Sequence, residues 1–112
     1  MDFREYQRLA FRTARSDQEM EVRRLVAGLG LAGEAGEVAE LIKKQIGHGH
    51  EVAPEAIAKE LGDALWYTAL VATLYDLDLG TIAEENIEKL RRRYPEGFTS
   101  ADSVARQDVA EG

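Results

Sequence analysis

The 112-residue sequence contains no cysteine, which excludes disulfide bonds and thiolate metal ligands. Long apolar runs are also missing: the longest, from Ala64 to Leu74, is interrupted by polar side chains and falls short of the roughly 18 residues of a membrane span. The first residues mix acidic and basic side chains and lack the apolar segment of a secretory signal. We therefore expect a cytoplasmic protein with no membrane partner.

Basic side chains are in the minority, with 14 lysines and arginines against 21 acids and a net charge of -7. A protein that wraps a nucleic-acid polymer needs a basic surface to displace counterions, so this partner is not expected. Length allows one domain with a modest core. A helical chain of this size is expected to rely on a partner subunit.

Proline is scarce as well, with only Pro54 and Pro95, and no segment alternates β-branched and polar residues as a strand does. The apolar spacing predicts four helices, at about 3–15, about 21–46, about 54–77, and from about 78 or 81 to just before Tyr94. The expected fold is all-α, a four-helix-bundle-like module. We expect residues 1–98 to form the domain and residues 99–112 to form a polar, flexible tail.

Two pairs of acids stand at helical spacing. Glu34 and Glu37 are three residues apart, which places them about 60° apart on one side of a helix. Glu34 falls within the apolar stripe, and Glu37 falls at its edge. Glu60 and Asp63 repeat the spacing on the next helix, at the start of a stretch that is apolar nearly all round. Both pairs are therefore expected to enter the interior from neighbouring helices.

Ionised carboxylates that share a buried space repel one another and need a compensating charge. A hard divalent cation with oxygen ligands supplies it, and Mg²⁺ suits a site shared with water and phosphate oxygens better than Ca²⁺, which usually has a dedicated loop. A single acid pair is more typical of a solvated face. Two pairs that interrupt apolar stripes favour a functional site. Glu40 is left open, because Lys44 follows it by four residues and can pair with it.

Other polar residues have two interpretations each. Lys43 and Lys44 end the second helix, where cations either complement the helix dipole or bind phosphate. Asn86, Lys89 and Arg93 share one side of the fourth helix, as a solvated face or as a stripe that receives a triphosphate. For Trp66 we expect core packing.

Three segments together resemble the MazG-like nucleotide pyrophosphohydrolases of the all-α NTP pyrophosphatase superfamily. They read GLAGEAGEVAELIKK (30–44), KELGDALWYTALVA (59–72) and ENIEKLRRRYPEGF (85–98). The family pattern is Glu-x-x-Glu followed after a gap by Glu-x-x-Asp, and Glu34, Glu37, Glu60 and Asp63 fill it. Where some relatives carry a further glutamate, this chain has Gly33.

The resemblance implies a homodimer or homotetramer that hydrolyses an NTP or dNTP to its monophosphate and pyrophosphate in nucleotide-pool housecleaning. It implies that the four acids hold Mg²⁺, with Mn²⁺ as a substitute, and that Glu37 with Glu34 acts on the attacking water. The matching positions imply that the substrate is contacted by Lys44, Tyr67, Asn86, Lys89 and Arg93. Two alternatives remain: a phosphoribosyl-ATP pyrophosphohydrolase-like enzyme, and a non-catalytic helical interaction module.

Overall fold

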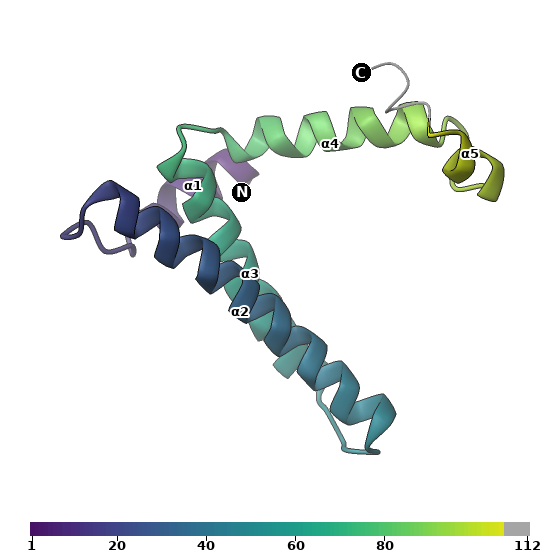
Figure 1. Cartoon of the computed structure of the whole chain (residues 1–112), viewed down its shortest axis with the longest axis horizontal. Coiled ribbons are helices and arrows are strands. Elements are labelled where there is room, and N and C mark those ends of the chain that lie inside the picture. The colour runs from purple at the N-terminus through teal and green to yellow at the C-terminus, as the bar shows by residue number, and fades with distance from the viewer. Residues whose placement is uncertain (107–112) are drawn as a thin grey trace. The chain divides into compact units, whose positions relative to one another are not determined.

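A computed structural model describes residues 1–106 and contains helices only, apart from one isolated bridge between Pro95 and Gly97. The helices, shown in Figure 1, are α1 (Phe3–Phe11), α2 (Met20–Gly47), α3 (Pro54–Leu74), α4 (Leu79–Arg93) and α5 (Ser100–Ala105). The expected all-α class is confirmed. The chain divides into two compact units, of which the first is Met1–Asp78 and the second begins at Leu79.

The first unit is built on a helical hairpin. The long helices α2 and α3 run side by side in opposite directions and are joined by the short loop at 48–53, while α1 packs against α3 (Figure 1). Pro54 starts α3, where its missing N–H costs no helical hydrogen bond. Because both acid pairs lie on this hairpin, the packing of α2 against α3 positions them.

The first helix is shorter than expected, ending at Phe11 instead of continuing to residue 15. Asp2 caps its start by accepting a hydrogen bond from the Glu5 amide at 2.8 Å. At its end the hydroxyl of Thr13 donates to the Ala10 carbonyl at 2.7 Å, and the Thr13 amide bonds the same carbonyl. A threonine side chain that bonds the backbone in this way offers an alternative to a further helical turn.

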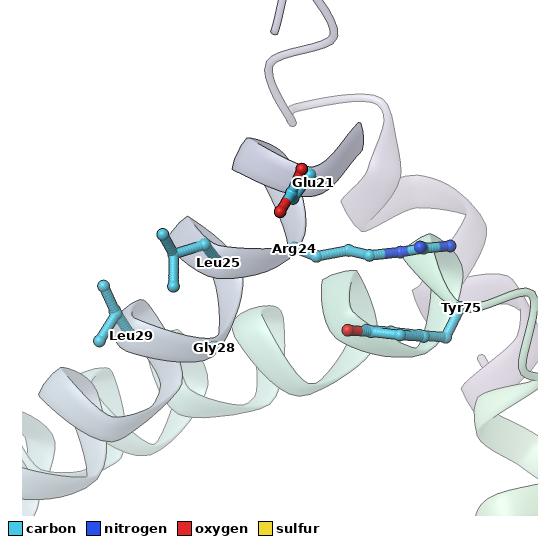
Figure 2. A pocket seen from close by; sticks show the side chains of 6 residues that line it. All are labelled: Glu21, Arg24, Leu25, Gly28, Leu29 and Tyr75. Atoms are coloured by element: carbon cyan, nitrogen blue, oxygen red, sulfur yellow. The ribbon is translucent and has the colours of Figure 1, made fainter. Parts of the chain in front are cut away.

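The third helix also stops early, at Leu74 rather than near Leu77, because Asp76 takes a left-handed backbone with φ 57°. Arg24 of α2 fastens this end: its Nε donates to the Leu74 carbonyl at 3.0 Å, and its guanidinium lies over the Tyr75 ring at 4.4 Å (Figure 2). A cation here also complements the carboxyl end of the helix.

The fourth helix begins at Leu79, next to the first of the two expected starts, so Thr81 lies inside it. The short helix α5 falls in the segment expected to be a tail: Thr99 caps it by accepting from the Asp102 amide at 3.0 Å. The rest of that expected tail, residues 107–112, lies outside the described residues.

The interior of the first unit is made of small side chains. Its buried apolar residues are Ala10, Ala27, Ala69, Ala72 and Leu74. Alanines at these positions let α1, α2 and α3 approach closely. Residues 64–74 of α3 are all buried or half-buried, which confirms the expectation from their apolar sequence.

Gly30 of α2 is needed for the packing of Tyr67. A Cβ atom at Gly30 would lie 2.2 Å from Cε1 and 2.5 Å from Cζ of the Tyr67 ring, so the ring rests on the bare backbone of α2. At Gly28, one half-turn earlier, a Cβ would meet nothing within 4 Å.

These two glycines give a matched pair of substitutions. Gly28→Ala is expected to raise the free energy of unfolding by about 0.5–1 kcal/mol, because alanine favours the helix and has room. Gly30→Ala gains the same helical preference but forces Tyr67 to move, at a typical cost of about 1–3 kcal/mol. Urea unfolding followed by circular dichroism measures both. A Gly30→Ala protein as stable as Gly28→Ala would contradict the described contact.

Candidate functional site

Three carboxylates from the two hairpin helices converge. One oxygen from each of Glu34, Glu37 and Glu60 lies within 4.8 Å of the other two. Glu34 and Glu37 come from α2, and Glu60 comes from the first half of α3. We call these three residues the acidic cluster. The expectation that acids from neighbouring helices meet is confirmed for this set.

The members of the acidic cluster differ in their access to water. Glu34 and Glu60 are half-buried, and Oε2 of each is closed to water and has no hydrogen-bond partner in the described part of the chain. Glu37 is exposed. This agrees with the position of Glu34 within the apolar stripe and of Glu37 at its edge. Buried carboxylate oxygens without donors are costly, so the cluster has an unmet need for positive charge.

The electrostatics of Glu37 show the same need. A hydrogen bond with Glu60 and the negative charge of that residue raise the pKa of Glu37 above its usual value, and partial loss of hydration and the charge of Asp63 add to the effect. Mg²⁺ prefers oxygen ligands, and in proteins it combines carboxylates with water and phosphate oxygens. The unpartnered Oε2 atoms and the repulsion at Glu37 would both be relieved by a hard cation, so the residues fit such a site.

Asp63 lies beside the acidic cluster rather than within it. It lies one turn beyond Glu60 on α3 and is exposed, so the expectation that both acid pairs enter the interior is wrong for this residue. Its charge still acts on Glu37. A cavity of about 260 Å³ is lined by Glu34, Asp63, Trp66 and Tyr67. We call it the acidic cavity. Tyr67, expected to contact substrate, therefore faces the same space as two of the predicted metal ligands.

Tyr6 is a site neighbour that the sequence did not reveal. Burial raises the pKa of its phenol, and the negative charge of Asp63 raises it further. On the sequence Tyr6 is one member of the apolar face of the first helix. Only the packing of α1 against α3 brings it near Asp63, so no local spacing signals it.

Trp66, for which core packing is expected, also makes a hydrogen bond and a ring contact. It is half-buried, its indole Nε1 donates to the Thr13 hydroxyl at 2.8 Å, and its ring meets that of Tyr67 edge-on with centroids 5.0 Å apart. This links α3 to the turn after α1 and orients the aromatic wall of the acidic cavity.

The lysines at the end of α2 pair with Glu40. The Nζ atom of Lys43 lies 3.7 Å from one carboxylate oxygen of Glu40, and that of Lys44 lies 4.0 Å from the other. The expected pairing of Glu40 with Lys44 is present, while a functional role for Glu40 stays open. A substrate role for Lys44 stays a prediction.

The remaining predicted substrate contacts lie on α4, in the second unit. Asn86 and Lys89 are exposed, while Arg93 is half-buried with its guanidinium carbon 5.8 Å from the centre of the Tyr94 ring. Their contact with substrate stays a prediction. Among residues 1–106, no helix has the length and hydropathy that crossing a bilayer requires.

These features define an all-α protein whose neighbouring helices hold a cluster of carboxylates. The MazG nucleotide pyrophosphohydrolase domain family matches residues 24–98, and the chain belongs to this family. The chain is also similar to the gene 37 protein of Mycobacterium phage L5, with 37% identity over 73 residues. That match covers 62% of this chain and 64% of the phage protein, so it spans less than two thirds of this relative. No solved structure matches the chain significantly.

The raised pKa of Glu37 predicts how the stability of the metal-free protein depends on pH. A carboxyl whose pKa is raised on folding contributes to stability at pH values below its usual pKa of 4.5. This contribution is lost as the pH rises through the folded-state pKa. In chelator, the free energy of unfolding of the wild type is therefore expected to fall relative to that of Glu37→Gln as pH rises from 4 toward neutrality. Urea unfolding at a series of pH values measures the difference.

The control repeats the comparison in a Glu60→Gln background. Without the Glu60 charge, the pH-dependent difference between a protein that keeps Glu37 and one that carries Glu37→Gln should shrink, because the largest causes of the raised pKa are removed. A difference that is independent of pH, or that survives unchanged in this background, is incompatible with the described repulsion.

Proposed function

We propose that this protein is a Mg²⁺-dependent nucleoside triphosphate pyrophosphohydrolase that converts an NTP or dNTP to the monophosphate and pyrophosphate. The observation that carries the proposal is the pair of buried, unpartnered Oε2 atoms of Glu34 and Glu60, with a Glu37 oxygen within 4.8 Å. Membership of the MazG family supports the reaction class. A cytoplasmic role in nucleotide-pool housecleaning is part of the same proposal.

Glu34, Glu37, Glu60 and Asp63 are the proposed metal ligands, for Mg²⁺ or for Mn²⁺ in its place. When bound there, such an ion neutralises phosphate charge and holds the triphosphate for in-line attack. Asp63 is included because it lines the acidic cavity with Glu34, although it stands outside the acidic cluster itself.

Within the chain, Glu37 is the proposed group that accepts the proton of the attacking water, assisted by Glu34. Glu37 is the exposed member of the acidic cluster, so water reaches it. In the reaction the water oxygen bonds to the α-phosphorus, the bond from that phosphorus to the bridging oxygen breaks, and pyrophosphate leaves with the electron pair. Tyr67 in the acidic cavity, Lys44, and the α4 residues Asn86, Lys89 and Arg93 are the proposed substrate contacts.

A homodimer or homotetramer is the proposed assembly. Its support is the apolar surface of α2, where Leu25 and Leu29 are 62% and 65% exposed and line a surface hollow with Gly28 and Tyr75 (Figure 2). Leucines exposed to this degree on one helix face, over a core made mainly of alanines, are typical of a chain that buries more surface in an assembly.

The test is a pyrophosphate-release screen over ordinary and modified NTPs and dNTPs and phosphoribosyl-ATP, with Mg²⁺, with Mn²⁺ and with chelator. The wild type is expected to release pyrophosphate from at least one NTP or dNTP only when the metal is present. Glu60→Gln should lower turnover by about 10²-fold or more, the order seen when one element of transition-state charge stabilisation is removed. Circular dichroism should show that its helices are retained.

Glu55→Gln is the matched control, because Glu55 is an exposed acid in the first turn of the same helix. Its turnover should stay close to that of the wild type. Release from phosphoribosyl-ATP alone would reassign the substrate. No release from any compound, together with a Glu60→Gln variant that is only more stable, would show a non-catalytic helical module and overturn the proposal.

A further inference from the structure

A second cavity, of about 140 Å³, adjoins the acidic cavity. Trp66 and Tyr67 line both cavities, so the two spaces share these aromatic side chains. The other apolar lining includes Leu70 of α3, and the polar lining consists of Arg15, Gln18 and Arg23. We call this space the arginine cavity. It lies entirely within the first unit and combines two aromatic rings with two arginines, of which Arg15 is already paired with Asp17.

Arg23 has donors that the rest of the structure leaves unused. Its Nε and Nη2 atoms are closed to water and have no acceptor among the described residues. Its guanidinium carbon lies 5.9 Å from the centre of the Phe11 ring, so this ring covers one face of the guanidinium. The N–H groups along the edge of the guanidinium do not take part in that contact. Two buried N–H donors without acceptors are costly, which makes this position a candidate for binding a group that supplies them.

Nε and Nη2 form one edge of the guanidinium, with two parallel N–H bonds that suit a pair of adjacent acceptors. Arg15, which lines the same cavity, already uses this edge. The same two atoms of Arg15 bind both carboxylate oxygens of Asp17, at 3.0 and 2.8 Å. Arg24 differs from Arg23, because its Nε is satisfied by the Leu74 carbonyl and its face by Tyr75.

We propose that the arginine cavity receives the base of the nucleotide, and that the Nε–Nη2 edge of Arg23 selects bases with two adjacent acceptors. This rests on the proposed function for the position of the phosphates at the acidic cavity. Guanine offers O6 and N7 as such a pair, and cytosine offers O2 and N3. Adenine places a donor beside its N7 acceptor, and uracil and thymine place an N–H between their carbonyls. Trp66 and Tyr67 supply the aromatic contact for a flat ring.

Binding is measured through Trp66, the single tryptophan of the chain, whose fluorescence reports on the cavity it lines. The wild type, titrated with GMP, CMP, AMP and UMP in Mg²⁺ buffer, is expected to bind GMP or CMP about ten-fold or more tighter than AMP and UMP. Arg23→Met keeps the side-chain stem and should abolish this preference. Arg23→Lys keeps the charge without the two-donor edge and should abolish it as well.

Arg24→Met is the control, because Arg24 does not line the arginine cavity and its Nε is already satisfied by the Leu74 carbonyl, so this variant should keep the preference. Equal affinity of the wild type for all four monophosphates overturns the inference even if no variant folds. Inorganic phosphate that competes with GMP as strongly as CMP does would place a phosphate against Arg23 and overturn the assignment of the base.

Pyrophosphate release from GTP, CTP, ATP and UTP separates this inference from the proposed function. A wild type that releases pyrophosphate, with kcat/KM ratios between bases unchanged in Arg23→Met, overturns the inference and keeps the function. A wild type that releases none, yet binds GMP or CMP selectively through Arg23, overturns the function and keeps the base site.

Discussion

The mutual repulsion of Glu34, Glu37 and Glu60 is the constraint on which the rest of the first unit depends. Three carboxylates with oxygens within 4.8 Å of one another separate unless a scaffold holds them. The α2–α3 hairpin is that scaffold, and its small interior residues, such as Ala27 and Ala69, let the two helices lie close. Holding these charges together lowers the stability of the fold, which is usual for a site that binds a cation and unusual for a solvated helix face.

Tyr67 connects this cluster to the rest of the site. Its ring rests on Gly30 of α2, meets Trp66 edge-on and lines both the acidic cavity and the arginine cavity. Trp66 is in turn held by the Thr13 hydroxyl after α1. A movement of α1 or α2 would therefore change the shape of both cavities. The proposed phosphate binding and base binding would be coupled through the Trp66 and Tyr67 rings.

The sequence predicts the helices and the inward position of Glu34 well, because both depend on the local 3.6-residue period. It predicts the ends of α1 and α3 less well, since these depend on the Thr13 hydroxyl and on the left-handed turn at Asp76. The proximity of Tyr6 to Asp63 and the unused donors of Arg23 arise only when distant segments pack together. No pattern of spacing along the chain could have signalled them.

Direct binding of Mg²⁺ to the acidic cluster tests the central claim most closely. When Mg²⁺ is added to chelator-treated protein, the thermal unfolding temperature should rise. The free energy of unfolding should increase by about 2.7 kcal/mol when the Mg²⁺ concentration reaches 100 times Kd. Glu34→Gln should unfold at a higher temperature than the wild type without metal and respond little to Mg²⁺. A wild type that does not respond, or a Glu34→Gln variant that responds equally, would contradict the account.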